Sequence, residues 1–185
     1  AIPQQTGKKK SMPHTLRIIV PGEVAAHINA TIISTDGTFA PAGIDGVTVA
    51  AGRVVEFPIE AMMQSGKFAL HITSDRPLAA AVLSKTLSVG KSDFVWSTPV
   101  PPLQKITMAV TGLSPMLVFT SAKIKVGIDL TTIRGKVRHV EINGEDIATY
   151  AVPDGIRAIT FTKVSAQTYA AGLIATKSGF GFAPI

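Results

Sequence analysis

The residues best suited to chemistry in this chain are four histidines, His14, His27, His71 and His139. None of them lies in an H-x-H or H-E-x-x-H pair, the spacings that bring two imidazoles to one metal ion. Three fall in predicted strands, on the face opposite the apolar residues, where an exposed imidazole is the ordinary outcome. No cluster of acidic residues has the spacing of metal ligands either. We therefore predict no metal site.

Motifs for nucleophilic catalysis and for cofactor binding are also missing. The sequence contains no G-x-S-x-G, no P-loop and no G-x-G-x-x-G, and it has no Cys, which excludes a Cys nucleophile and thiolate metal sites. The carboxylates are scattered singly, mostly beside turn glycines, as at Asp36, Asp45 and Asp154, where Asp supports a turn. The sequence thus predicts no catalytic residue and no cofactor, and it favours a protein that is not an enzyme.

Two features are suited to contact with a partner. Lys8, Lys9 and Lys10 form a run of cations that is either a solvated tail or a contact for an anionic membrane surface or cell-wall polymer. Trp96 is the single Trp and lies near the end of a predicted strand, where its ring either stacks on a sugar or packs in a core or between domains. We take these four residues as the candidate contact residues.

The composition limits the class of protein. The chain has 185 residues, of which 16% are charged and 6% aromatic, with a net charge of +6 and a mean hydropathy of +0.34. A chain this apolar is expected to have largely buried strands. No apolar run is long enough to predict a membrane span. The cations do not form a stripe with interleaved aromatics, so no specific nucleic-acid partner is expected. Because residue 1 is Ala and not Met, we expect a trimmed or processed chain, which a membrane anchor can precede.

The elements that must position these residues are strands. Phe68, Leu70 and Ile72 alternate with polar residues, and residues 74–77 form a turn, so residues 66–85 are predicted to be a hairpin. The same pattern returns at residues 156–177, shifted by 91 positions. Residues 16–22 likewise match residues 106–112 at a shift of 90.

Other local patterns also predict strands and turns. Ile28, Ala30 and Ile32 alternate with polar residues, which is typical of a half-buried strand. Asp36-Gly37 predicts a turn, and Asn143-Gly144 predicts a tight hairpin turn because both residues tolerate positive φ. The tail at residues 179–185 is expected to add an edge strand.

These patterns together predict an all-β protein. A period of about 90 residues suits a small β-sandwich of about 100 residues. We expect two tandem antiparallel β-sandwich domains, immunoglobulin-like or jelly-roll-like, related by internal duplication. The expected organisation is a flexible N-terminal segment (residues 1–14), domain 1 (15–98), a Pro-rich linker (99–102) and domain 2 (103–185).

Four segments resemble a known family. LRIIVPG at residues 16–22, VTVAAGRVVEFPIE at residues 47–60 and SDRPLAAAV at residues 74–82, with DFVW at residues 93–96, are similar to an uncharacterised family of actinobacterial exported or envelope-anchored proteins. The resemblance covers most of residues 15–98 and is weaker from residue 103 on. It implies repeated β-sandwich units behind an N-terminal membrane anchor, in a domain of unknown function, and no particular activity.

Our leading hypothesis is a non-catalytic interaction or spacer protein, extracellular or in a bacterial cell envelope, with a protein or a cell-wall polymer as its partner. The alternative is a carbohydrate-binding module with Trp96, Tyr150 or Tyr169 as a stacking platform, which requires at least two aromatics on one exposed surface. A third reading is a capsid-type sandwich in which Lys8–Lys10 form a nucleic-acid arm, and the internal duplication and the short basic run argue against it.

Overall fold

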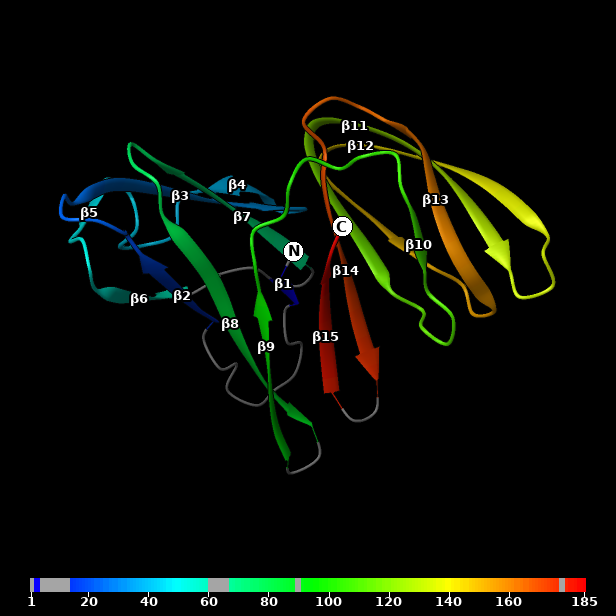
Figure 1. Cartoon of the computed structure of the whole chain (residues 1–185), viewed down its shortest axis with the longest axis horizontal. Helices are drawn as coiled ribbons and strands as arrows, with labels where there is room; N and C mark the ends of the chain where they lie inside the picture. Colours follow the sequence, from blue (N-terminus) through cyan, green and yellow to red (C-terminus); the bar gives the residue numbers. More distant parts are fainter. Residues whose placement is uncertain (1, 4–13, 60–66, 89–90, 177–178) are drawn as a thin grey trace. The chain divides into compact units, whose positions relative to one another are not determined.

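The computed structural model describes residues 2–3, 14–59, 67–88, 91–176 and 179–185. Every regular element in this part of the chain is a β-strand (Figure 1), so the predicted all-β class is confirmed. The described part also contains no helix that is long and apolar enough to cross a membrane. The chain divides into two compact units. The N-terminal unit consists of Ile2–Pro99, to which Gly179 and Phe180 also belong, and the C-terminal unit consists of Val100–Thr176 and Gly181–Ile185.

The N-terminal unit consists of two antiparallel sheets. One has the strand order β1-β7-β3-β4, with β5 also paired to β3, and the other has the order β6-β2-β8-β9. The strands are β1 (Ile2–Pro3), β2 (His14–Ile19), β3 (Ala26–Ser34), β4 (Gly37–Phe39), β5 (Val47–Val49), β6 (Val54–Ile59), β7 (Lys67–Ser74), β8 (Ala79–Ser88) and β9 (Lys91–Ser97). Residues 4–13 of the expected flexible segment lie outside the described residues.

Both sheets of the N-terminal unit contribute to one hydrophobic core. Its fully buried side chains include Leu16 and Ile18 from β2, Ile28 and Ile32 from β3, and Phe68 from β7. Along β3 the buried and exposed residues alternate as the sequence predicts, because successive side chains of a strand point to opposite faces. The core therefore lies where the two sheets present their apolar faces.

The predicted hairpin at residues 66–85 is wrong. β7 pairs with β1 and β3, whereas β8 pairs with β2 and β9 in the other sheet. The intervening turn is instead a corner that carries the chain from one sheet to the other. It is fixed to β3 because the backbone N–H of His27 donates to Asp75 Oδ1 at 2.8 Å, and the Asp75 N–H donates to the His27 carbonyl at 3.3 Å.

The C-terminal unit is built around one long strand. Its sheet has the order β10-β13-β11-β14-β15, with β12 also paired to β11. The strands are β10 (Thr107–Ala109), β11 (Met116–Thr132), β12 (Val137–Ala151), β13 (Ile156–Val164), β14 (Tyr169–Thr176) and β15 (Gly179–Pro184). β15 is the edge strand expected from the tail. The first part of β11 pairs with β14 and its second part with β13, so the predicted hairpin at 156–177 is also a corner.

The predicted turn at Asn143-Gly144 is wrong as well. These residues lie inside β12, opposite Lys125 and Ile124 of β11 and beside a β-bulge. At Gly144 an added Cβ would lie 3.1 Å from the Ala148 Cβ, so here the glycine serves close packing rather than a turn. The β11–β12 hairpin turns instead at residues 133–136, where Gly135 has φ 81°.

Candidate functional site

Aromatic, apolar and charged side chains meet on one face of the four-stranded sheet in the N-terminal unit. Arg17 lies opposite Glu56 and Ala81, and Leu83 lies opposite Trp96. Directly opposed residues point to the same side of a sheet, and in this case the side is the one away from the core. This outer face comprises Val54, Glu56 and Pro58 of β6, Thr15, Arg17 and Ile19 of β2, Ala79, Ala81, Leu83 and Lys85 of β8, and Phe94 and Trp96 of β9.

Arg17 connects the strands of the outer face through its side chain. Its guanidinium carbon lies 5.0 Å from the centroid of the Trp96 ring, a cation–π contact of about 0.5–1 kcal/mol at an exposed site. The Arg17 Nε also donates a hydrogen bond to a carboxylate oxygen of Glu56. An exposed ion pair adds little to stability. The two contacts together fix the direction of the guanidinium, so one face of the Trp96 ring is covered by Arg17.

Three apolar side chains of the outer face are strongly exposed. Phe94 and Val54 are each 61% exposed, and Ile19 is 38% exposed. Single exposed apolar residues are common on protein surfaces, but these three share their face with a half-buried Trp and an Arg. Arg and Trp are enriched at the centres of protein interfaces. The composition of the outer face is therefore suited to burial against another molecule.

The structure separates the candidate residues expected from the sequence. Trp96 lies on the outer face. Lys8, Lys9 and Lys10 lie outside the described residues. Tyr150 packs against the core of the C-terminal unit, and Tyr169 on β14 is 37% exposed, so both belong to a different unit from Trp96.

Sequence reasoning missed the residues that accompany Trp96, namely Arg17, Glu56 and Phe94. A signal was available in Leu16-Arg17-Ile18-Ile19 and Val54-Val55, where apolar residues occupy consecutive positions. In a strand such a run places apolar side chains on both faces.

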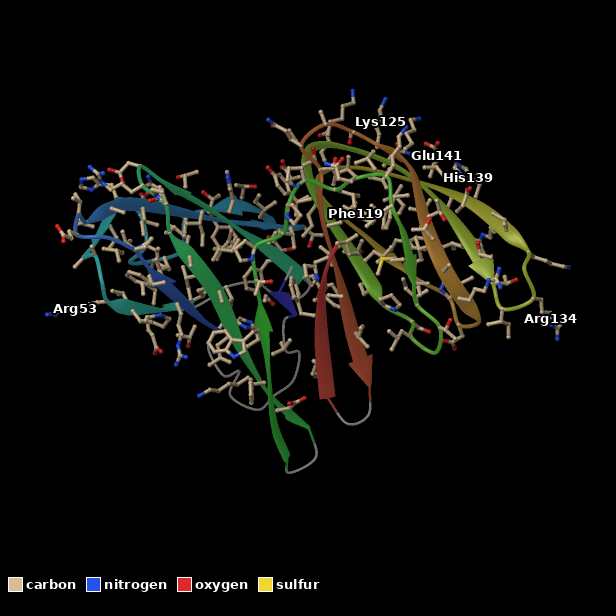
Figure 2. All side chains as sticks on the ribbon, in the orientation of Figure 1. Arg53, Phe119, Lys125, Arg134, His139 and Glu141 are labelled. Atoms are coloured by element: carbon tan, nitrogen blue, oxygen red, sulfur yellow. The ribbon has the colours of Figure 1, made fainter. Side chains whose placement is uncertain are left out.

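A second polar cluster lies on the exposed surface of the C-terminal unit. His139 Nδ1 lies 2.7 Å from Asp129 Oδ1, its Nε2 lies 3.6 Å from Glu141 Oε1, and the Lys163 Nζ lies 3.7 Å from the same Glu141 oxygen. Figure 2 shows His139 and Glu141 side by side at the surface. The imidazole ring lies over Gly127, where an added Cβ would be 3.3 Å from His139 Cε1.

The His139 cluster is arranged for charge pairing. The hydrogen bond from the His139 ring to the Asp129 carboxylate is the largest cause that raises the pKa of His139 above its ordinary value of 6.5, and Glu141 adds to it. The two carboxylates lie at opposite ring nitrogens, so they cannot share one metal ion with the imidazole. Among the described residues, no group of three His, Cys, Asp or Glu side chains could hold a metal.

We expect Asp129→Asn to lower the pKa of His139, and to lower it more than Glu141→Gln does, because the Asp129 hydrogen bond is the larger cause. Because the pKa is raised in the folded state, the pairing of protonated His139 with the carboxylates stabilises the fold fully below pH 6.5. This stabilisation is lost as the pH rises through the folded-state pKa. The measurement is an NMR titration of the His139 ring signals over pH 5–9, which gives the pKa of His139 in the wild type and in both variants. A larger shift in Glu141→Gln than in Asp129→Asn would contradict the assignment.

A third polar pair is buried in the core of the N-terminal unit. His14 is 7% exposed and Ser84 is 1% exposed, and His14 Nδ1 lies 2.8 Å from Ser84 Oγ. The imidazole also packs edge-on against Phe68, with ring centroids 5.4 Å apart. Burial lowers the pKa of His14 to about 4. A neutral, enclosed imidazole of this kind is suited to packing rather than to contact with a substrate.

A comparison with protein families shows which family the chain belongs to. The model of the family of unknown function DUF5719 matches residues 5–152. The chain belongs to this family. The residues matched by DUF5719 include the outer face and the β11–β12 hairpin, and the match ends before β13 begins. The match confirms one part of the expected resemblance, namely that a domain of unknown function covers most of the chain. No curated protein and no solved structure matches the chain.

Proposed function

We propose that this DUF5719 chain is a non-catalytic interaction protein, extracellular or in a bacterial cell envelope, that binds a protein partner through the outer face of its N-terminal unit. The observation that supports this most is the composition of that face. Phe94 and Val54 are each 61% exposed there, on the two edge strands of the sheet, and Arg17 of the Arg17–Trp96 pair lies on a strand between them. Interfaces are enriched in aromatic residues and Arg, and their central residues contribute most of the binding energy.

We also propose that the two units are tandem β-sandwiches that arose by duplication. The strands β3, β7, β8 and β9 correspond in order to β11, β13, β14 and β15, and the pairings β3–β7 and β8–β9 recur as β11–β13 and β14–β15. Gly22 and Gly112 lie 90 positions apart, and both take positive φ, 91° and 75°. Other pairings differ between the two units. β2 pairs with β8 whereas β10 pairs with β13, and β11 pairs with β14 whereas β3 and β8 lie in different sheets.

The two corners, between β7 and β8 and between β13 and β14, support the duplication further. Ser165 lies 90 positions after Asp75 and makes the same pair of contacts. Its N–H donates to the Lys125 carbonyl at 3.0 Å, and the Lys125 N–H donates to Ser165 Oγ at 3.0 Å. In the N-terminal unit Asp75 makes these two contacts with His27. A reciprocal side-chain and backbone contact at equivalent corners is more specific than a shared apolar pattern.

The polar clusters support a non-catalytic role. His139 has a carboxylate at each ring nitrogen, so its unprotonated form, which a general base requires, is disfavoured. His14 is enclosed in the core. Location at the envelope is supported by the resemblance of residues 16–22 and 47–60, and recognition without a reactive centre suits rigid sheets.

The double variant Val54→Ser/Phe94→Ser is expected to weaken partner binding at least about 30-fold, since the truncation of residues that carry an interface's binding energy costs about 2 kcal/mol or more. The measurement is affinity capture from envelope extracts, followed by titration of the captured protein. Val24→Ser is the matched control, because Val24 is 55% exposed and lies outside the outer face. Equal capture by the double variant and the wild type would contradict the assignment of the face.

Carbohydrate binding is the second candidate function. It is favoured by one observation: Phe94 and Trp96 are two positions apart on β9 and point to the same exposed face. Stacking needs an open ring face, and Arg17 covers one face of Trp96, which leaves Phe94 as the main platform. Binding on a glycan array that is lost in Phe94→Ala and kept in Val54→Ser would favour a sugar over a protein partner.

A further inference from the structure

The turn of the β11–β12 hairpin is exposed and basic. Residues 133–139 are exposed without interruption, and they include the cations Arg134, Lys136 and Arg138 and no acidic residue. Next to these cations in the sequence are two exposed apolar side chains, Ile133 at 64% and Val137 at 62%. We call residues 133–138 the hairpin tip. Figure 2 shows Arg134 at the turned end of the hairpin, away from Phe119.

The cations of the hairpin tip are not neutralised by nearby carboxylates. Among the described residues, the ion pairs of the hairpin involve His139, Asp129, Glu141 and Lys163 and none of the three tip cations. Asp129 is already hydrogen-bonded to His139. Asp154 lies in the loop at the base of the tip, and its carboxylate accepts a hydrogen bond from Ser114. The tip is therefore a local excess of positive charge.

Backbone contacts hold the hairpin tip in a fixed shape. The N–H of Thr132 donates to the Lys136 carbonyl at 2.8 Å, and the Gly135 N–H donates to the Thr132 carbonyl at 2.9 Å. The Ile133 N–H donates to the carbonyl of Gly155 at 2.9 Å, which fixes the tip to the next loop. Little ordering of the backbone is then needed on binding.

We infer that the hairpin tip binds the surface of an anionic phospholipid bilayer. Lys and Arg near such a surface each contribute through attraction to the lipid headgroups, and exposed apolar side chains beside them enter the headgroup boundary. A soluble polyanion would use the cations but would gain nothing from Ile133 and Val137. A nucleic acid would call for aromatics on which bases stack, and the tip has none. This surface is separate from the outer face and goes beyond the proposed function.

Sedimentation of the full chain with vesicles of 30% phosphatidylglycerol in phosphatidylcholine tests the inference. The wild type is expected to bind these vesicles and to leave pure phosphatidylcholine vesicles unbound. The variant Arg134→Gln/Lys136→Gln/Arg138→Gln is expected to lose about 100-fold in partitioning, at about fivefold for each cation. Ile133→Ser/Val137→Ser keeps the charge and is expected to lose about tenfold.

One control removes the same charge elsewhere. Lys105→Gln/Lys123→Gln/Lys125→Gln removes three exposed cations and is expected to keep most of the vesicle binding. No vesicle binding by the wild type would overturn the inference, as would a loss in this control that equals the loss in the tip variant. Unchanged vesicle binding by Ile133→Ser/Val137→Ser, with equal retention on heparin, would replace the bilayer with a soluble polyanion. Partner capture through the outer face is a separate readout, so each proposal can fail alone.

Discussion

Lowering the pH from 7 to 4 is expected to reduce the free energy of unfolding of the N-terminal unit by about 3 kcal/mol through His14 alone. Burial lowers the pKa of this imidazole from 6.5 to about 4, while the unfolded chain keeps the ordinary value. Between these two values the unfolded state binds the proton and the folded state does not, so stability rises with pH across this window. The contribution of neutral His14 to the free energy of unfolding is complete above pH 6.5 and is lost as the pH falls toward 4.

Chemical denaturation at pH 7, 5.5 and 4 measures this effect. Carboxylates also titrate in acid, so the informative quantity is the difference in pH dependence between the wild type and His14→Gln, which is polar and cannot titrate. His27→Gln is the control, because His27 is an exposed imidazole of the same unit. We expect the wild type and His27→Gln to lose stability in parallel and His14→Gln to lose about 3 kcal/mol less. An equal loss in His14→Gln would show that His14 is not enclosed as described.

The second large effect is expected in the core of the C-terminal unit. Phe119 on β11 is 0% exposed, and its ring meets that of Phe161 edge-on, with centroids 6.4 Å apart. Phe119→Ala removes buried apolar volume and leaves a cavity, so the free energy of unfolding is expected to fall by about 3–5 kcal/mol. That is a large fraction of the about 5–15 kcal/mol by which domains are stable.

Equilibrium unfolding in urea measures the change for Phe119→Ala and for Phe119→Leu, which leaves a smaller cavity. We expect the Leu variant to lose less than the Ala variant. The exposed Phe94 of the other unit gives the comparison, because Phe94→Ala should change the free energy of unfolding by less than about 1 kcal/mol. A loss below 1 kcal/mol in Phe119→Ala would mean that Phe119 is not a central residue of the core.

The alternation of apolar and polar residues predicted the strands but not their partners. Ile28, Ala30 and Ile32 are buried on β3 as expected, because burial of one face produces a period of two along the chain. The same pattern could not show that β7 and β8 join different sheets. That choice depends on residues distant in the sequence, such as the contact of Asp75 with His27.

The misplaced turn at Asn143-Gly144 has a similar cause. The local preference of Asn-Gly for positive φ is real, but β11 and β12 pair along nearly their whole length. A bulge in β11 bends the hairpin at this point, and the residue with positive φ is Asp146, at 59°. Tertiary pairing thus prevailed over a local turn preference.

The candidate face could be found only in part from the sequence. Trp96 was identified because it is the single Trp. Its companions Arg17 and Phe94 carry no motif, and Arg17 approaches Trp96 only through the pairing of β2, β8 and β9. A cation–π contact between distant segments leaves no local pattern in the sequence.

The most direct measurement for the central claim is photocrosslinking in the native cell envelope with a photoreactive phenylalanine at position 94. Position 24 is the matched control, since Val24 is 55% exposed but lies outside the outer face. We expect a discrete crosslinked protein from position 94 and none from position 24. The absence of a product at position 94, or the same products at both positions, would contradict a binding role for the outer face.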